Sequence, residues 1–223
     1  TVSAIIGHAD LRLGANVADI LQAQIETANG LFRGIRHSVT WDDNPAVHNT
    51  AAHQAKEQMS SANFQTGAKI LAGMGHSLEG WMFFSQMEEL ARFAKAVPNL
   101  TIILCHVGGL LGTGVYAGRQ DEVMEAWRKG ISAAAEQPNI VIKLGGIGMP
   151  SVGNDWHLRE KPIGSEELAA AMAPTINYCI EKFGPNRSMF ESNFPVDKVS
   201  YSYHVMYNAF KRIAKDYSAS EKA

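Results

Sequence analysis

The sequence contains little cysteine, no long apolar run and almost no excess charge of either sign. Only two of its 223 residues are cysteines, Cys105 and Cys179. Both lie inside apolar segments and lack the spacing of metal ligands, which excludes a cysteine-based metal motif. They are typical of small core residues in a reducing compartment.

Other absences narrow the range of partners. No apolar run approaches the length of a membrane span and no signal-peptide pattern opens the chain, so we expect a cytoplasmic protein with no membrane partner. The formal net charge is only −2, which indicates no nucleic-acid partner. His48 and His53 lie five residues apart, so they do not share a helical face and indicate no metal site. We interpret residues 1–223 as a single domain, because no repeat or low-complexity segment divides them.

The stretch Thr101–Gly109 shows the clearest structural pattern. Four apolar residues after a threonine predict a buried parallel strand, and the two glycines after His106 allow a sharp turn. In parallel α/β proteins, side chains at the carboxyl ends of strands form the site. His106 is therefore a candidate metal ligand or proton carrier, and the alternative is a buried neutral histidine bonded to a backbone carbonyl.

Strand and helix patterns alternate along the chain. Ser85 and Glu88 predict a capping box at the start of a helix that Pro98 ends. Pro174 is expected to break another helix or to start a second one. The expected strands cover about 2–7, 31–39, 77–84, 101–106, 139–144 and 187–193, and helices are expected to begin near 16, 61, 85, 121, 165 and 200.

This alternation predicts the fold class. A βαβ series with right-handed crossovers builds a parallel sheet or barrel. The glycine-rich residues 112–119 lack the order G-x-G-x-x-G, so they do not indicate a dinucleotide-binding turn. Polar residues at the exits of several strands favour a (β/α) barrel of the TIM type, which needs eight strands to close.

Four motifs, in order, resemble the amidohydrolase-related family, which includes lactonases and some decarboxylases. Residues 187–196 (RSMFESNFPV) resemble its last barrel strand, and residues 105–109 (CHVGG) its histidine-ending sixth strand. Residues 34–37 (GIRH) resemble its fourth strand and residues 142–146 (IKLGG) its seventh. Together these motifs span nearly the whole chain.

The resemblance implies an eight-stranded barrel whose first strand ends in a His-x-His pair. No His-x-His occurs here, the chain starts at Thr1 rather than Met, and residues 2–10 match the third strand. We therefore expect an incomplete α/β barrel of about six parallel strands, without the first two. Its open edges and apolar interior favour a homo-oligomer. Family members use zinc or manganese, but with no strand-one histidines to join His106 we expect no bound metal or other cofactor here.

The last motif departs from the family at the position of its catalytic aspartate. The family's Ser-Asp-x-Pro is Ser-Asn-x-Pro here, and the amide of Asn193 cannot act as a base, although it can orient a water or a ligand. Glu191 lies two residues earlier, on the same face of a strand, and is a candidate replacement whose burial should raise its pKa unless it is paired. Asp197 is the other candidate. Alternatively, Glu191 is a structural carboxylate that pairs with Arg36 or Lys143.

The candidate substrate-binding residues lie at other strand exits. Arg36 suits a substrate carboxylate, as the resemblance also implies, and its alternative role is a structural ion pair. His37 alternates with Arg36, so only one of the two should face the interior. Trp81 could line a pocket or belong to the core, and Lys143 lies near the exit of its strand.

These observations predict a hydrolase of a small carboxylated ester, lactone or related compound. Water attacks the carbonyl with the help of a carboxylate base, and His106 polarises the oxygen or holds a metal. One alternative is a metal-dependent, non-oxidative decarboxylase of the same family. Another is an inactive barrel remnant that acts as a binding module.

Overall fold

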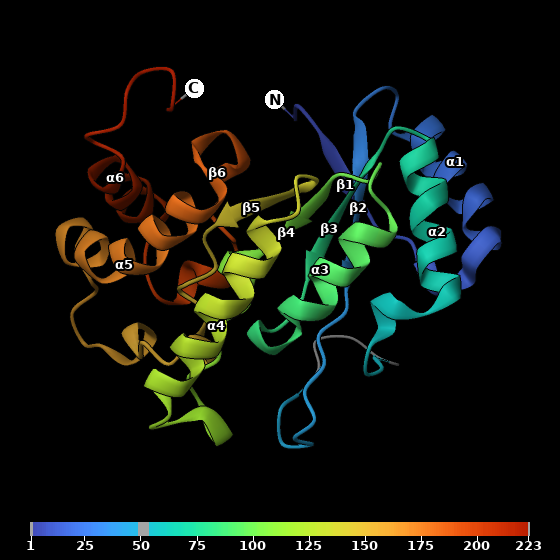
Figure 1. Ribbon diagram of the computed structural model, residues 1–223. Coiled ribbons are helices and arrows are strands. Elements are labelled where there is room, and N and C mark those ends of the chain that lie inside the picture. Colours follow the sequence, from blue (N-terminus) through green and yellow to red (C-terminus); the bar gives the residue numbers. More distant parts are fainter. Residues whose placement is uncertain (1, 49–53, 223) are drawn as a thin grey trace.

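The structure, a computed structural model, describes residues 2–48 and 54–222 (Figure 1). Its six described strands form one parallel sheet in chain order, β1 to β6, with helices in the connections. The strands are β1 (Ile5–Gly7), β2 (Phe32–Ser38), β3 (Ser77–Trp81), β4 (Ile102–Leu104), β5 (Ile140–Leu144) and β6 (Ser188–Phe190). The α-helices are α1 (Val17–Thr27), α2 (Ala62–Gly73), α3 (Met87–Ala96), α4 (Gln120–Ala135), α5 (Ser165–Phe183) and α6 (Tyr203–Ile213).

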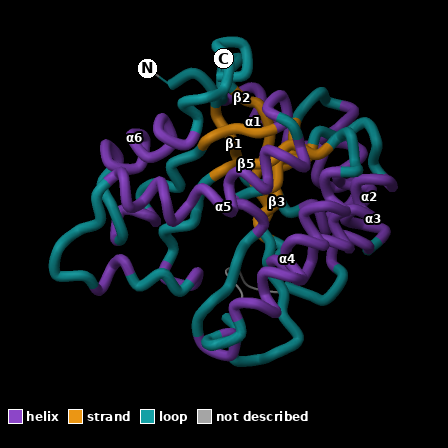
Figure 2. The backbone as a smooth tube through the Cα atoms, turned by 60° about the vertical axis from the view of Figure 1, so that its left-hand side comes forward, coloured by secondary structure: helices purple, strands orange, loops and turns teal. Residues whose placement is uncertain are grey.

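Alternate residues of each strand face the helices, because side chains point to opposite faces of a sheet. Figure 2 shows the strands gathered together with the helices around them. The helix-covered face carries the apolar core, to which the helices contribute residues such as Leu71, Leu90 and Trp127. Strand residues of this core include Ile35, Leu78, Ile102, Leu104, Ile140, Ile142 and Leu144, each at most 2% exposed.

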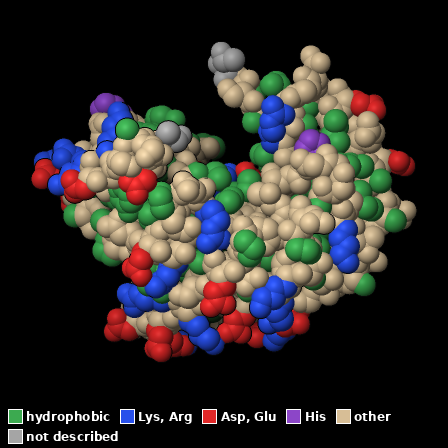
Figure 3. Space-filling view, turned by 45° about the horizontal axis from the view of Figure 1, so that its top comes forward, with side chains coloured by type: hydrophobic (Ala, Val, Ile, Leu, Met, Phe, Trp, Pro, Cys, Tyr) green, Lys and Arg blue, Asp and Glu red, His purple; other side chains and the backbone are tan. Residues whose placement is uncertain are grey.

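The other face of the sheet carries charge. The register pairs Arg36 with Glu79 across β2 and β3, and Lys143 with Met189 across β5 and β6. These residues alternate with the core positions, so they lie on the face that the helices do not cover. Figure 3 shows the surface of the molecule hollowed between its two flanks.

The sheet is open. Among the described residues β1 pairs with β2 and β6 with β5, so β1 and β6 form two separate edges (Figure 1). The predicted fold class, an α/β chain with six parallel strands, is confirmed. The interpretation as one domain stays a prediction.

Two local predictions are wrong. The predicted capping box of Ser85 and Glu88 is absent; instead Gln86 Oε1 accepts hydrogen bonds from the backbone N–H groups of Phe83 and Trp41. Helix α5 does not break at Pro174 but continues to Phe183. Met172 and Ile176, on either side of this proline, are fully buried, and their packing offsets the missing backbone hydrogen bond.

The prediction about His53 lies outside the described residues. Within the part of the chain that the structure describes, no helix has the length and apolar character needed to cross a membrane.

Candidate active site

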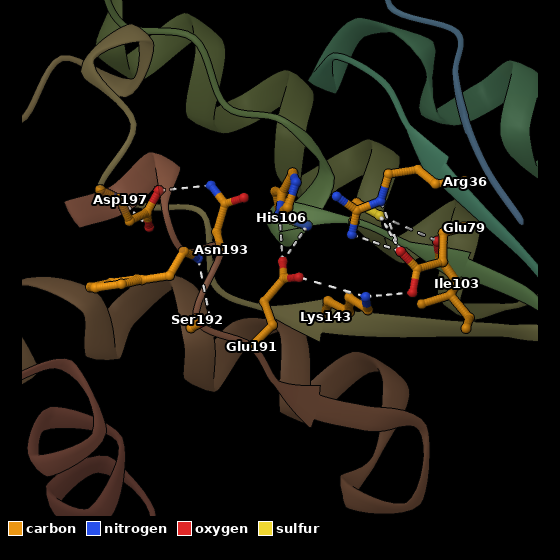
Figure 4. Close-up of polar contacts among 12 residues, drawn as sticks. Arg36, Glu79, Ile103, His106, Lys143, Glu191, Ser192, Asn193 and Asp197 are labelled. Carbon is orange, nitrogen blue, oxygen red and sulfur yellow. Dashed lines mark hydrogen bonds and ion pairs between the residues drawn. The ribbon is translucent and has the colours of Figure 1, made fainter. Parts of the chain in front are cut away.

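His106 and Glu191 meet at the carboxyl ends of β4 and β6 (Figure 4). His106 Nδ1 lies 2.5 Å from Glu191 Oε1, and both side chains are buried, at 5% and 10% exposure. A carboxylate can only accept hydrogen bonds, so Nδ1 carries the hydrogen and, in the neutral ring, Nε2 keeps a free lone pair. Nε2 has no partner among the described residues and is not sealed from solvent. It can therefore accept a proton from a bound molecule.

The turn that carries His106 has an unusual backbone. His106 and Val107 both have positive φ, 57° and 47°, a region that branched side chains such as valine rarely enter. Two hydrogen bonds stabilise this turn: His106 N–H donates to Glu191 Oε1 at 3.0 Å, and Trp127 Nε1–H donates to Val107 O at 2.7 Å. Strained backbone held by its surroundings is typical of functional sites.

A row of alternating charges crosses the same face. Glu79, only 4% exposed in its side chain, accepts hydrogen bonds from Arg36 at 2.8 Å and from Lys143 at 2.6 Å, using a different oxygen for each. Lys143 Nζ also lies 3.8 Å from Glu191 Oε2. The row thus runs from Arg36 through Glu79, Lys143 and Glu191 to His106 (Figure 4). The Arg36 side chain is 42% exposed, and its Nη1 has no partner among the described residues, so it can bind a ligand carboxylate.

The pairing changes the acidity of Glu191. Burial raises its pKa, but the hydrogen bond and charge of His106, with the charge of Lys143, outweigh burial and hold the pKa below its ordinary value. The raised pKa expected for an unpaired Glu191 is therefore not found. The carboxylate is a hydrogen-bond acceptor for His106 and a weak base.

Asp197 and Asn193 form a second, adjacent pair. Asn193 Nδ2–H donates to Asp197 Oδ1 at 2.7 Å, and Tyr201 O–H donates to Oδ2 at 2.7 Å. Burial raises the pKa of Asp197 more than these hydrogen bonds lower it. Asp197 is fully buried, so it lies beneath the site rather than on its surface.

Two other strand-end residues line the site. The Trp81 ring meets the His106 ring edge-on at a centroid distance of 4.8 Å. Cys105 Sγ lies 3.9 Å from Glu79 Oε2, and burial raises the pKa of this thiol to about 12, so it stays protonated and unreactive.

Comparison with known proteins identifies the family. The model of the amidohydrolase family matches residues 3–223, nearly the whole chain. The chain belongs to the amidohydrolase family. The uncharacterized protein y4mH of Sinorhizobium fredii is 34% identical over 98% of this chain and 65% of its own length. L-fucono-1,5-lactonase of Burkholderia multivorans is 24% identical over 100% of the chain and 68% of its own length. The chain thus spans about two thirds of the length of these two relatives.

Solved structures show the same fold. An amidohydrolase from Burkholderia multivorans with bound HEPES superposes with a TM-score of 0.76 at 23% identity, over 99% of this chain and 69% of that chain. A zinc-bound crystal form of an amidohydrolase from that organism gives a TM-score of 0.76 at 22% identity, over the same shares of the two chains. The predicted family is confirmed.

The structure brings most of the predicted amidohydrolase site residues together, but not all. His106, Glu191, Lys143, Arg36 and Trp81 form one connected group. The alternative prediction was that Glu191 pairs with Arg36 or Lys143. The ion pair with Lys143 is present at 3.8 Å, whereas none with Arg36 is found among the described contacts, because Arg36 pairs with Glu79.

The position of Asn193 differs from simple strand alternation. Strand β6 ends at Phe190 and Asn193 has a φ of 50°, so the alternation that was expected to align it with Glu191 stops before it. Its side chain bonds to Asp197, the other predicted carboxylate. A turn, rather than a strand, thus connects Asn193 with Glu191 and Asp197.

His37 lies apart from this group, contrary to its prediction as a candidate substrate-binding residue. Its ring packs edge-on against Phe64 of α2 at 5.1 Å, and Nδ1 accepts the N–H of Leu11 at 3.4 Å. Burial lowers its pKa to about 4, so it is a neutral ring within the helix-covered layer. The alternation of β2 gives the interior position to Arg36.

Sequence reasoning missed Glu79, Tyr201 and Trp127. Glu79 is the one carboxylate of an otherwise uncharged strand, β3, and this signal could have marked it. The hydrogen bonds of Tyr201 and Trp127 depend on loops that meet only in the folded chain, and no local pattern marks them.

The described residues do not supply a catalytic zinc site of three ligands, the usual number in this chemistry. No group of three or more His, Cys, Asp or Glu side chains within 2–48 and 54–222 is placed to hold one ion. His106 Nδ1 is bonded to Glu191, and Asp197 accepts hydrogen bonds on both of its oxygens. The expectation that the protein binds neither zinc nor manganese stays a prediction.

Proposed function

We propose that the protein is a hydrolase of a small carboxylated ester or lactone. The observation that carries this proposal is the His106–Glu191 pair, whose oriented ring leaves Nε2 free to accept a proton. Membership of the amidohydrolase family and the similarity to L-fucono-1,5-lactonase support a hydrolytic reaction at a carbonyl.

The pair acts in the manner of a carboxylate–histidine dyad. Glu191 accepts the Nδ1 hydrogen, holds the ring in one tautomer and stabilises the positive charge that forms on it. His106 Nε2 takes a proton from water as the water oxygen bonds to the carbonyl carbon. The tetrahedral intermediate then expels the ester oxygen, which receives that proton from His106. Water is consumed, one C–O bond forms and one breaks.

Arg36 binds the substrate carboxylate, and Lys143 adds a second positive charge behind it. Glu79 holds both cations at fixed positions through separate oxygens, which lowers the entropy lost when an anion binds. Arg36 keeps part of its guanidinium exposed, whereas the Lys143 side chain is only 15% exposed. Arg36 therefore makes the first contact, and Lys143 sets the potential near Glu191.

One observation favours a second candidate, a binding module without catalysis. Asn193 occupies the position at which the family resemblance places a catalytic aspartate, and an amide cannot replace that base. Such a module would bind the same carboxylated ligands through Arg36 without turning them over.

The test is the hydrolysis of a panel of sugar lactones and carboxylated lactones. The rate is measured at constant pH from the acid that hydrolysis releases. We expect His106→Asn and Glu191→Gln to lower kcat by about 10²–10⁴-fold, the usual contribution of acid–base groups. His204→Asn, an exposed histidine on α6, is the matched control and should keep full activity. Binding of lactone acids by calorimetry without any turnover would instead support the binding module.

A further inference from the structure

The turn after β6 fixes the orientation of the Asn193 side chain. Its amide nitrogen donates to Asp197 Oδ1 at 2.7 Å, and the backbone N–H of Asp197 donates to Asn193 O at 3.2 Å. The φ of Asn193 is 50°, a conformation that asparagine tolerates better than most residues. Two hydrogen bonds thus connect the same two residues.

Asp197 is itself fixed by two groups that donate hydrogen bonds to one of its oxygens. Its Oδ2 accepts the hydroxyl of Tyr201 at 2.7 Å and the backbone N–H of Gly148 at 3.1 Å. Ser200 Oγ–H donates to the carbonyl of Gly148 at 2.6 Å and holds that loop in place. The carboxylate is therefore immobile, and its Oδ1 remains as the acceptor for Asn193.

This arrangement leaves the amide oxygen of Asn193 as a free acceptor. Because the NH₂ group faces Asp197, Oδ1 must lie on the opposite side of the amide, and Figure 4 shows it directed toward His106. Asn193 Oδ1 has no partner among the described residues and is not sealed from solvent. Asn193 Oδ1 is thus an acceptor directed toward the ring of His106, whose Nε2 is the second acceptor without a partner among the described residues.

We propose that Asn193 positions the attacking water and that Asp197 holds Asn193 in the orientation this requires. The inference rests on the proposed hydrolase function. The water donates one hydrogen to Asn193 Oδ1 and the other to His106 Nε2, so its lone pairs point away from both, toward the substrate carbonyl. The proton passes to His106 as the new C–O bond forms, and Asn193 keeps its hydrogen bond throughout. Asparagine thus supplies the orientation but not the base.

Asp197→Asn tests this proposal. Asparagine has the same shape as aspartate, but its NH₂ group would force the side-chain amide of Asn193 to turn over. The new carboxamide must turn its oxygen toward the backbone N–H of Gly148, which can only donate, so its NH₂ faces residue 193. Asn193 must then rotate and present its own NH₂ to the water, which removes the acceptor. We expect kcat to fall about a hundredfold, as for a misplaced reacting group, with little change in KM.

The double variant Asn193→Asp with Asp197→Asn should restore much of this loss. Aspartate at 193 accepts the NH₂ of residue 197 with one oxygen and presents the other to the water. The restored acceptor is also a carboxylate base, so the acid limb of the pH profile should change as well. A purely structural role for Asp197 predicts no such rescue.

Asn139→Ala is the control outside this network. Asn139 precedes β5, at the end of the strand opposite the site, and its amide donates to the carbonyls of Ala94, Val97 and Leu100, so the variant should lower the melting temperature and leave kcat unchanged. Full kcat in Asp197→Asn, or no rescue in the double variant, would overturn the proposal. If His106→Asn still abolishes turnover in that case, the hydrolase function stands.

Hydrogen exchange of the Asn193 side-chain amide gives a readout besides activity. In the unmodified chain its protons should exchange more slowly than those of the exposed Asn44, and the Asp197→Asn variant should change their chemical shifts. Rapid exchange in the unmodified chain would overturn the fixed orientation. Slow exchange in a chain that hydrolyses no lactone would overturn the hydrolase function and the water-positioning role while confirming the fixed amide.

Discussion

One oxygen of Glu191 accepts two hydrogen bonds from a single residue, His106: one from its backbone N–H at 3.0 Å and one from its ring Nδ1 at 2.5 Å. The main chain of the turn and the tautomer of the ring are therefore set by the same atom. A substitution of Glu191 should change both, whereas a substitution that only moves the ring should change the chemistry alone.

Gly146→Ala should damage the site by displacing His106. A Cβ at residue 146 would lie 2.5 Å from His106 Cβ, and the φ of 72° is unfavourable for alanine. Gly75→Ala is the matched control, because its φ of 77° carries the same backbone strain but no atom lies within 4 Å of the added Cβ. Both variants should lose about 1 kcal/mol of unfolding free energy from the backbone strain, and Gly146→Ala should lose more because of the contact and should alone lose kcat. Equal activity in the two would contradict the contact with His106.

Glu191→Gln should change the pH dependence of stability. The folded pKa of Glu191 is lowered, so its stabilising contribution is complete above the ordinary pKa of 4.5 and is lost as the pH falls through the lowered value. The unfolding free energy of the unmodified chain should exceed that of the variant by about 1–3 kcal/mol near neutrality. Urea unfolding at a series of pH values should show this gap closing below the ordinary pKa. A gap that stays constant in acid would contradict the pairing.

Glu79→Gln should destabilise the protein because it leaves Lys143 without its closest counter-ion. The effect should be below the 3–5 kcal/mol typical of a broken buried pair, since Arg36 is partly exposed to solvent. The double variant Glu79→Gln with Lys143→Met removes the buried cation as well and should recover part of the loss. Chemical unfolding of the two single variants and the double variant measures this coupling. Strict additivity would show that Glu79 and Lys143 do not stabilise each other.

Self-association is expected to involve the β1 edge. A groove of about 670 Å³ between α1 and this edge is lined by Ile5, Ile20 and Phe32, and the first two are 37% and 40% exposed. Ile20→Lys should shift the protein toward the monomer in light scattering, because a lysine cannot be buried there at low cost. Leu158→Lys, a substitution at a more exposed apolar residue outside this groove, is the control. A monomer at all concentrations of the unmodified chain would contradict the expected homo-oligomer.

Chelation should leave the protein unchanged, because no group of three or more His, Cys, Asp or Glu side chains among the described residues is placed to hold one ion. Treatment with a strong chelator should alter neither the melting temperature nor the rate of lactone hydrolysis. Elemental analysis checks the same point, and one zinc or manganese per chain that disappears in His106→Asn would show the expectation to be wrong.

Much of the fold could be predicted from the sequence, because it depends on local patterns. Apolar runs such as Ile102–Leu104 and helical stripes such as that of α4 mark the six strands and the connecting helices, and their order implies a parallel sheet. The positions of His106 and Glu191 at strand ends follow from the same patterns. The resemblance of the motifs to the amidohydrolase family also needs no coordinates.

The pairing of side chains was decided only by the tertiary structure. Arg36 binds Glu79 rather than Glu191, and Asn193 turns to Asp197, because strand register and a left-handed turn bring these groups together. Such contacts join residues that are distant in sequence or lie beyond the end of a strand, where alternation no longer applies. A sequence determines which residues are polar and where regular elements end. The distances that fix tautomers, pKa values and amide orientations arise only when several elements pack together.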